Sequence, residues 1–291
     1  MGRPRVVLIG AAGQLGSDLA RTFDLDGELV ALKHQDLDLL DATRVGTLLA
    51  ELRPTHVVNT AAYNRVDQAE ADRDAAFALN ARAVGDLAAV CQRLGATLVH
   101  FSTDYVFDGR RATPYLEADV PNPLSVYAES KLAGERLALE RCERARVFRV
   151  SGLYGVARSS GKGGTNFVET MLRLATEGRP IRVVADQVLG PSYTLDLARK
   201  VWQVLPLAVH PIYHLTNAGA TSWHGFARRV FELAGLTPDL RPITAAEFGA
   251  RARRPAYSVL GHGNLTALGA DDLRPWEAAL AAYVAERASS R

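Results

Sequence analysis

Short apolar runs alternate with amphipathic patterns along the first half of the chain. Residues 6–9, 29–32, 56–59, 97–101 and 145–150 form apolar runs of strand length. Between them, apolar residues recur every three or four positions over residues 18–23, 45–52, 75–94 and 130–141, which predicts helices. Because alternating strands and helices build a parallel sheet through right-handed crossovers, this pattern predicts an α/β fold with a doubly wound parallel sheet, the Rossmann fold.

The second half of the chain has a less regular pattern. From it we expect a glycine-rich loop at 159–164, a helix at 166–176, strands at 181–185 and 212–215, and helices at 223–233 and 276–286. We predict a dinucleotide-binding Rossmann domain over residues 1–151, with sheet-closing contributions from about 181–218. The prediction adds a smaller C-terminal substrate-binding lobe over residues 152–180 and 219–272, and a C-terminal helix over 273–291.

Composition narrows the class of protein. The 291 residues are 48% hydrophobic and 23% charged, which is typical of folded rather than disordered chains. A net charge of +2 with scattered arginines argues against a nucleic-acid partner. The apolar runs are too short for a signal peptide or a membrane span, so we expect a cytoplasmic protein without membrane contact. Cys91 and Cys142 have neither metal-ligand nor redox spacing, which predicts buried free thiols and no metal site.

Three glycines follow the first expected strand. Gly10, Gly13 and Gly16 open a helix, and in this setting backbone N–H groups can approach a dinucleotide pyrophosphate, although a tight turn alone would also favour glycine. The second expected strand is followed by Lys33, where NAD-selective folds carry Asp or Glu. Because a cation attracts a 2′-phosphate, the sequence favours NADPH, with NADH as the alternative.

A phenol and an ammonium group lie four residues apart in the helical pattern after residue 126. On a helix Tyr127 and Lys131 share one face, and a nearby cation is expected to lower the tyrosine pKa from about 10. Such a pair can protonate a nascent alkoxide, although pairs with this spacing also occur by chance on exposed helices. Ser102 and Thr103 end the fourth expected strand and bring hydroxyl groups to the same edge of the sheet.

Taken in order, these motifs resemble the extended short-chain dehydrogenase/reductases and, within them, the dTDP-4-dehydrorhamnose reductase family. The resemblance runs nearly from end to end. It is carried by residues 10–16, by Ala61-Ala62-Tyr63 with Val66-Asp67 and Ala69-Glu70, and by residues 102–109, 127–131, 213–217 and 254–260.

The resemblance implies a reaction and a set of site residues. In this family the C4 ketone of a nucleotide-linked 6-deoxy-4-keto sugar, dTDP-4-dehydro-L-rhamnose, is reduced to dTDP-L-rhamnose. Tyr127 would supply the proton, Lys131 would hold the ribose, and Thr103 would polarise the carbonyl. Asp104 and Tyr105 would help to hold the sugar. With the three glycines and Lys33, the expected cofactor site comprises Gln14, Leu15, Asp38, Leu39, Ala61, Ala62 and Tyr63, together with the catalytic pair.

Two further positions are candidates for binding the nucleotide part of the substrate. Arg254, next to Arg251 and Arg253, offers a cation to a diphosphate, whereas a solvated loop is the alternative. Asn166 begins a helix whose free N–H groups would face the nucleotide, whereas capping by Thr165 would explain the same residues. For Asp38 the alternative to adenine binding is a helix cap or a solvated turn.

One departure leaves the substrate open. Where the family commonly reads Arg-Thr-Ser-Trp, this chain has Gly152 in place of the tryptophan. An aromatic platform beside the sugar would then be missing, which keeps a reductase or epimerase of another nucleotide sugar as an alternative. A second alternative is a non-catalytic NADP-binding regulatory subunit, like the β subunit of methionine adenosyltransferase, which resembles the same family. We expect a homodimer.

Overall fold

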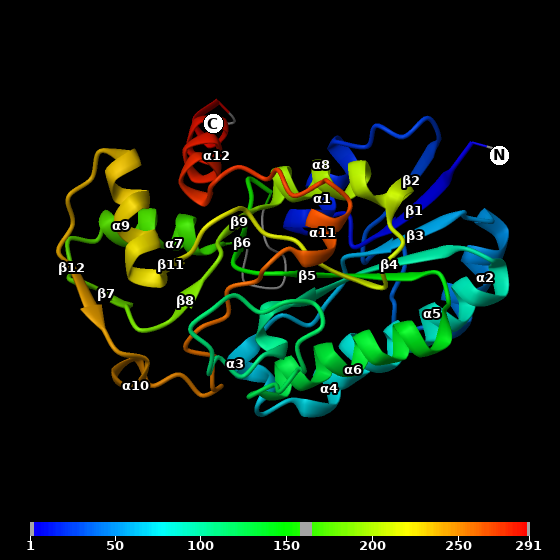
Figure 1. The fold of residues 1–291 in the computed structure, drawn as a ribbon, viewed down its shortest axis with the longest axis horizontal. Coiled ribbons are helices and arrows are strands. Elements are labelled where there is room, and N and C mark those ends of the chain that lie inside the picture. The colour runs from blue at the N-terminus through cyan, green and yellow to red at the C-terminus, as the bar shows by residue number, and fades with distance from the viewer. Residues whose placement is uncertain (1–2, 158–164, 290–291) are drawn as a thin grey trace.

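The computed structural model describes residues 3–157 and 165–289, and the glycine-rich loop expected at 159–164 lies outside them. A six-stranded parallel sheet forms the larger part (Figure 1). Its strand order is β10-β5-β4-β3-β1-β2, so the order reverses between β1 and β3. The strands are β1 (Arg5–Ile9), β2 (Glu28–Leu32), β3 (His56–Asn59), β4 (Thr97–Thr103), β5 (Ala145–Val150) and β10 (Ile212–His214). The predicted doubly wound α/β fold is therefore confirmed.

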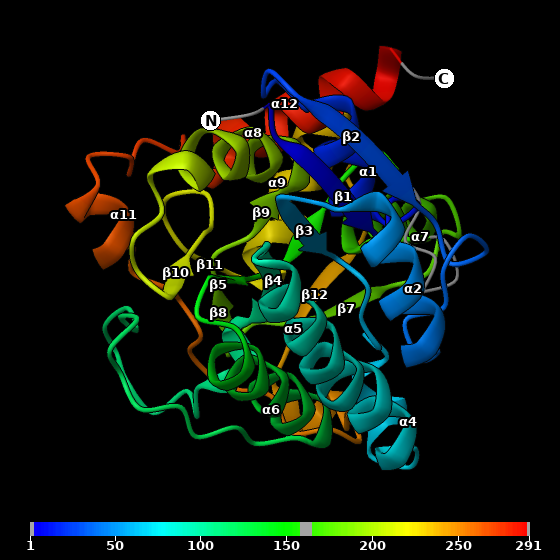
Figure 2. The same cartoon turned by 90° about the vertical axis from the view of Figure 1, so that its right-hand side faces the viewer.

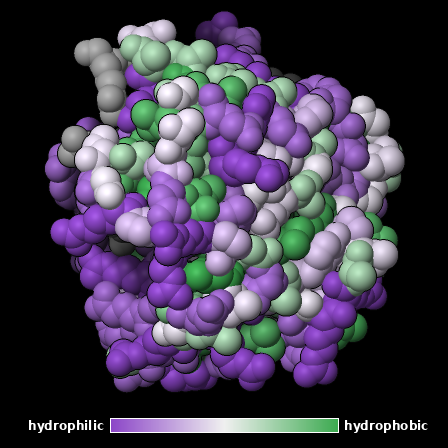
Figure 3. All heavy atoms as spheres, turned by 90° about the vertical axis from the view of Figure 1, so that its left-hand side faces the viewer, coloured by the Kyte–Doolittle hydropathy of each residue, from purple (hydrophilic) through white to green (hydrophobic). Residues whose placement is uncertain are grey.

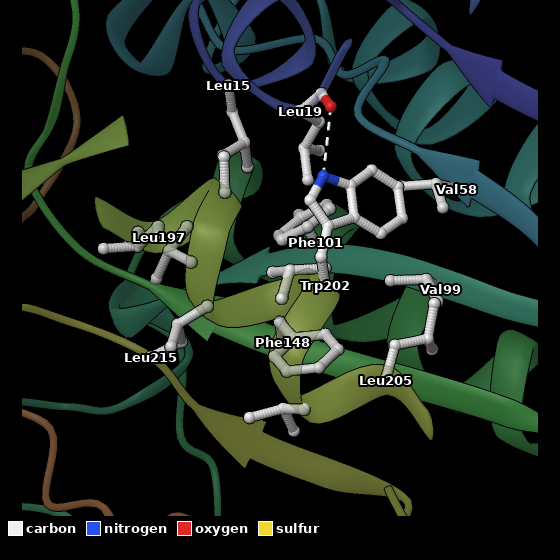
Figure 4. Close-up of a cluster of buried hydrophobic side chains, with 14 of the residues drawn as sticks. Leu15, Leu19, Val58, Val99, Phe101, Phe148, Leu197, Trp202, Leu205 and Leu215 are labelled. Atoms are coloured by element: carbon white, nitrogen blue, oxygen red, sulfur yellow. Dashed lines mark hydrogen bonds between the residues drawn. The ribbon is translucent and has the colours of Figure 1, made fainter. Parts of the chain in front are cut away.

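Helices cover both faces of this sheet (Figure 2). On one face α2 (Ala42–Leu52), α5 (Ala83–Leu94) and α6 (Val126–Arg141) share a buried apolar cluster with the strands. On the other face the cluster includes α1 (Gln14–Arg21), α8 (Thr194–Val204) and α11 (Gly263–Ala267). Trp202 lies at the centre of this second cluster, and its indole N–H donates to the Leu19 carbonyl at 3.0 Å (Figure 4). Burial of these two clusters holds the sheet between its helices.

Two helical features differ from the sequence-based expectation. The helix expected at 75–94 begins earlier and is interrupted: α4 (Arg73–Phe77) leads into a π-helical segment, η1 (Ala78–Arg82), and then into α5. Helix α8 was not predicted from the sequence. Nine of its eleven residues are buried, and Arg199 and Gln203, four residues apart, form the exposed side of an amphipathic pattern that the sequence does carry.

The smaller lobe packs around an aromatic cluster that includes Phe226, Trp276 and Tyr283. It contains α7 (Phe167–Ala175), α9 (Trp223–Ala234), α12 (Trp276–Ser289) and the parallel pair β7 (Ile181–Val184) and β12 (Leu240–Ile243). Short pairs join it to the sheet, β6 (Leu153–Tyr154) with β9 (Ser192–Tyr193) and β8 (Val188–Leu189) with β11 (Thr221–Ser222). The remaining short helices are α3 (Val66–Ala69), η2 (Asp104–Val106), η4 (Leu205–Leu207) and α10 (Ala245–Phe248). The domain boundaries given above stay a prediction.

The surface and the cysteines have the features of an ordinary globular protein. Hydrophilic and hydrophobic residues are interspersed over the face that the smaller lobe presents (Figure 3). Cys91 and Cys142 are buried and free, as predicted. None of the helices among the described residues is long and apolar enough to span a membrane.

Candidate active site

The predicted site residues gather where the parallel strands end. Ile9 at the end of β1 is in register with Leu32 of β2 and Asn59 of β3. Thr103, the last residue of β4, is in register with Val150 of β5. Because all these strands run the same way, the residues that follow them meet at one edge of the sheet, where the strand order reverses. Ligands of doubly wound sheets bind in this position.

The glycine turn between β1 and α1 can take a pyrophosphate. Gly10 has φ +84°, and a Cβ on it would lie 2.6 Å from the Thr60 hydroxyl. A Cβ on Gly16 would lie 2.3 Å from the Gly10 carbonyl oxygen, so these two glycines allow close packing of the turn. Gly13 differs: apart from its chain neighbours, only that carbonyl oxygen, at 3.4 Å, lies within 4 Å of its Cβ position among the described residues.

The N-terminus of α1 adds electrostatic support for an anion. Its N-cap, Gly13, makes no side-chain capping hydrogen bond, and the first turn contains no acidic residue. The partial positive charge of a helix N-terminus therefore acts on the space beside Gly13. A turn open at its middle glycine, in front of an uncapped helix, fits a dinucleotide.

The residues expected to contact the adenosine side lie beyond β2. Lys33 is exposed and directly follows β2, next to the glycine turn, because the Gly10 N–H donates to the Leu32 carbonyl at 3.0 Å. Asp38 is exposed, and its carboxylate accepts from the Leu40 N–H at 3.0 Å, as in a turn. Leu39 is buried in the core beside the sheet.

Two asparagines hold the segment that follows β3. The Asn59 carboxamide oxygen accepts from the Ala61 N–H at 3.0 Å. Asn80, in the π-helical segment, accepts from the Tyr63 N–H at 2.8 Å and donates to the Tyr63 carbonyl at 2.9 Å and to the Ser130 hydroxyl of α6 at 3.0 Å. Asn80 was not predicted from the sequence. The sequence signal for it is a polar residue on the apolar side of a helical pattern, four residues after Ala76 and four before Val84. π-Helical turns are frequent at functional sites.

The first turn of α6 carries Tyr127 and is fixed by two acceptors. The Ser125 hydroxyl caps the helix by accepting from the Ala128 N–H at 3.3 Å. The Glu70 carboxylate, from the end of α3, accepts from the Val126 N–H at 2.8 Å. One helical turn later Lys131 is buried, with 2% of its surface exposed.

Tyr127 is in contact with Thr103 and not with the lysine charge. A hydrogen bond to the Thr103 hydroxyl favours the phenolate, but burial is the stronger influence and raises the pKa of Tyr127 to about 12. The expectation that Lys131 lowers this pKa is therefore wrong. The physical reason is that the Lys131 ammonium donates instead to the Phe101 carbonyl at 2.6 Å.

Lys131 is part of a buried polar chain. Its ammonium also lies 3.5 Å from His100 Nε2, and His100 Nδ1 lies 3.3 Å from the Asn59 carboxamide. Burial lowers the pKa of Lys131 to about 8, and the nearby Glu135 carboxylate opposes this shift. Burial and the Lys131 charge keep the pKa of His100 well below its usual value. His100 is therefore neutral, and Lys131 is the charged member of this row of hydrogen-bonded side chains at neutral pH.

Asp104 and Tyr105 continue from Thr103 along the wall of the site. The Asp104 carboxylate accepts from the Thr103 hydroxyl at 3.1 Å and from the Ser151 hydroxyl at 2.8 Å. Burial raises the pKa of Asp104 to about 6. The Tyr105 ring stands perpendicular to that of Tyr127, with 6.3 Å between ring centroids.

Arg254 reaches this wall from the smaller lobe. Its guanidinium binds both oxygens of Asp67, at 3.1 and 2.7 Å, and hydrogen bonds to Tyr105. Arg251 and Arg253 are exposed. The arginine cluster of the sequence thus divides into one residue held at the site and two in solvent.

Asn166 joins the smaller lobe to the glycine turn. It is itself the N-cap of α7, accepting from the Glu169 N–H at 2.9 Å, so the capping assigned to Thr165 as an alternative is corrected. Its carboxamide nitrogen donates to the Gly155 carbonyl at 2.9 Å, and Gln14 donates to the same carbonyl at 3.3 Å. Gln14 and Asn166 therefore meet at one backbone oxygen.

Nearly the whole chain is similar to one protein family. Residues 4–289 match the model of the family described as RmlD substrate binding domain. The chain belongs to this family. A relative in the family named dTDP-4-dehydrorhamnose reductase, from Streptomyces griseus, is 40% identical over 96% of this chain and 92% of its own length. A probable dTDP-4,6-dihydroxy-2-methyloxan-3-one 4-ketoreductase from Streptomyces antibioticus is 43% identical over 95% of this chain and 93% of its own.

A solved structure agrees with the family assignment. The crystal structure of dTDP-4-dehydrorhamnose reductase from Bacillus anthracis, in complex with NADP, has a TM-score of 0.92 and 37% identity. It covers 98% of this chain and 100% of the other. The sequence-based assignment to the dTDP-4-dehydrorhamnose reductase family is therefore confirmed.

Gly152, at the position where this family commonly carries tryptophan, follows β5 with φ +54°. A Cβ at this position would lie 2.8 Å from the Leu189 side chain and 3.2 Å from Pro191 Cα. A larger residue would be strained by the left-handed backbone and would have to displace the Leu189 side chain.

Proposed function

We propose that the protein is an NADPH-dependent reductase that converts dTDP-4-dehydro-L-rhamnose to dTDP-L-rhamnose. The observation that carries the proposal is the arrangement of Thr103, Tyr127 and Lys131 at the sheet edge that also carries the open glycine turn. Membership of a family whose relatives bear the name of this reductase supports the same activity.

The charge states of the residues suit reduction. Tyr127, with its pKa raised to about 12, keeps its proton at neutral pH and can donate it to the C4 oxygen. The Thr103 hydroxyl, in contact with that phenol, would bind the carbonyl oxygen by turning its proton from Asp104 to the substrate. Lys131 would hold the nicotinamide ribose. NADPH, when bound, supplies the hydride that C4 receives.

Other residues would bind the two ligands around these groups. For the cofactor we propose the residues of the glycine turn together with Lys33, Asp38, Leu39 and residues 61–63. For the substrate we propose Asp104 and Tyr105 at the sugar and Asn166 and Arg254 towards the nucleotide. The exposed ammonium of Lys33 beside the turn supports a preference for the 2′-phosphate of NADPH.

A second candidate is a reductase acting on another nucleotide-linked keto sugar. Gly152 favours it, because the aromatic ring that the family commonly carries at this position is missing, and a side chain there would be strained by the left-handed backbone. The similarity to a probable 4-ketoreductase of a different sugar supports it as well. Both candidates use the same proton donor.

Turnover by the wild type and the Tyr127→Phe variant tests the proposal. We expect dTDP-4-dehydro-L-rhamnose to be reduced with oxidation of NADPH, measured by absorbance. The variant should bind NADPH normally and lose kcat by about a hundredfold or more, because a positioned proton donor is missing. Rapid oxidation only with another dTDP-keto sugar would support the second candidate. NADPH binding without turnover of any keto sugar would instead indicate a regulatory subunit.

Two sequence-based expectations remain predictions. A homodimer would appear in sedimentation velocity as a species of twice the 31.4 kDa chain mass. The cytoplasmic location is tested by fractionating the cells that produce the protein.

A further inference from the structure

The short helix α3 lies beside the active site, and none of its side chains takes part in the proposed proton or hydride transfer. It carries the Val66-Asp67 and Ala69-Glu70 motif that stood out in the sequence. It lies between the catalytic helix α6 and the chain that follows α10 (Figure 1). Each of its two carboxylates contacts one of these neighbours.

Glu70 contacts the catalytic helix at the residue next to the proton donor. Its Oε1 accepts from the Val126 N–H at 2.8 Å. An anion at a helix N-terminus is favourable, and this bond satisfies a donor that the helix cannot satisfy itself. Together with the Ser125 cap, the Glu70 carboxylate fixes where the first turn of α6 begins, and so where the Tyr127 phenol lies.

Asp67 contacts the smaller lobe. Its Oδ1 accepts from the Ala252 N–H at 3.0 Å, and both of its oxygens bind the Arg254 guanidinium. Arg254 is mostly buried, with 17% of its side chain exposed, and its other hydrogen bonds go to the Ala252 carbonyl and to Tyr105. Asp67 thus holds the planar guanidinium of Arg254, whose remaining hydrogen bond goes to Tyr105, the residue whose ring lies beside Tyr127.

We propose that Asp67 and Glu70 are positioning residues of the reductase, through which α3 sets the distance between the catalytic phenol and the wall formed by Tyr105 and Arg254. This inference rests on the proposed reductase function. It assigns different effects to the two carboxylates. Glu70 acts on the proton donor, so its loss lowers kcat. Asp67 acts on the substrate wall, so its loss raises the substrate KM.

The Glu70 part is tested with three variants and one control. Glu70→Gln keeps an oxygen that can accept the Val126 N–H, whereas Glu70→Ala removes it and Glu70→Asp shortens the side chain while keeping the charge. We expect Glu70→Ala and Glu70→Asp to lower kcat about tenfold or more, since small displacements of a catalytic group are costly, and Glu70→Gln to stay close to wild type. Gln68→Ala, on the same helix but hydrogen bonded to Arg65, is the matched control and should be normal.

A direct measurement accompanies the kinetics. Hydrogen exchange of the Val126 amide should be faster in Glu70→Ala and Glu70→Asp than in Glu70→Gln, with NADPH affinity unchanged in all three. Equal exchange and equal kcat in all three variants would overturn the role of Glu70. This readout does not need turnover, so it decides the point even if the wild type reduces no keto sugar, a result that would refute the proposed function alone.

The Asp67 part is tested by a double-mutant cycle with Arg254→Lys. We expect Asp67→Asn to raise the KM for dTDP-4-dehydro-L-rhamnose about tenfold with kcat changed less than about twofold, because the wall and not the proton donor is displaced. The double variant should be no worse than the worse single variant. Effects that multiply would mean that Arg254 binds the substrate independently of Asp67 and would overturn this part, as would an unchanged KM in Asp67→Asn.

Discussion

Lys33 is the residue on which cofactor preference depends. It lies at the end of β2 beside the glycine turn, where a negative charge would repel a 2′-phosphate. Lys33→Asp should therefore lower the ratio of kcat/KM for NADPH to that for NADH by about tenfold or more. Arg93→Asp makes the same charge change at an exposed site near the end of α5 and should leave the ratio unchanged. An unaltered ratio in Lys33→Asp would assign the preference to other groups.

Asp104 makes stability depend on pH. Its pKa is raised from 3.8 to about 6, so between these values the folded protein holds a proton that the unfolded chain has released. The free energy of unfolding then falls as the pH rises through this range, by about 3 kcal/mol for this group. Urea unfolding at pH 4 and pH 7 should show Asp104→Asn gaining about this much relative to wild type at the higher pH. A difference independent of pH would contradict this.

Residues differ in how far their role could be predicted from the sequence. The glycine turn and the pair Tyr127 and Lys131 were predicted because their geometry is local and follows from spacing along one turn or helix. The partners of Asn80 and Glu70 lie 17 to 56 positions away, so only the folded chain brings them together. The predicted shift of the Tyr127 pKa was wrong in direction, because burial, which only the folded structure determines, outweighs the expected effect of the Lys131 charge.

Helix α6 and the π-helical segment approach each other closely at one glycine. Adding a single methyl group there tests whether this contact constrains the site. A Cβ on Gly134 of α6 would lie 2.0 Å from the Asn80 carbonyl oxygen. Gly134→Ala should therefore lower the free energy of unfolding by about 1–3 kcal/mol and weaken NADPH binding, because Asn80 holds the segment at Tyr63. Thermal unfolding and fluorescence titration measure the two effects.

A helical glycine without close tertiary neighbours serves as the matched control. Apart from its chain neighbours and the backbone of its own helix, Gly46 of α2 has no atom within 4 Å of its Cβ position among the described residues. Gly46→Ala should stabilise the protein by up to about 1 kcal/mol through helix propensity and leave NADPH affinity unchanged. If Gly134→Ala behaved like Gly46→Ala, the contact would not constrain the site.

Most, but not all, elements with a clear hydrophobic period were predicted. The five strands of the first half are found close to their expected limits because buried parallel strands read as apolar runs. Helix α8 and strand β12 escaped prediction. The first carries an amphipathic pattern, with Arg199 and Gln203 on its exposed side, that was overlooked. The second contains Pro242 and an exposed Arg241, which hide a strand pattern.

At the scale of the whole molecule, the two lobes are tied at several points. Arg21 of α1 pairs with Glu286 of α12 at 2.6 Å. Gln14 of α1 and Asn166 of the smaller lobe donate to the same Gly155 carbonyl, at 3.3 and 2.9 Å. Leu280 of α12 is fully buried in the core of the smaller lobe. Leu280→Ala should cost about 2–5 kcal/mol, and these ties should spread the loss over both lobes.

Hydrogen exchange distinguishes cooperative from independent lobes. In the cooperative case the slowest amides of β1 and β4 lose as much protection in Leu280→Ala as those of α9 and β7. Loss confined to α9 and β7 would show that the smaller lobe unfolds alone.

The burial of both cysteines makes the chain a convenient host for site-specific labels. Burial raises the pKa of the Cys91 and Cys142 thiols, which keeps them in the unreactive protonated form, out of reach of reagents in solution. A single cysteine introduced on the surface would then be the fast-reacting thiol of the described chain, without removal of the native pair. Probes of lobe separation can therefore be attached to an otherwise unaltered protein.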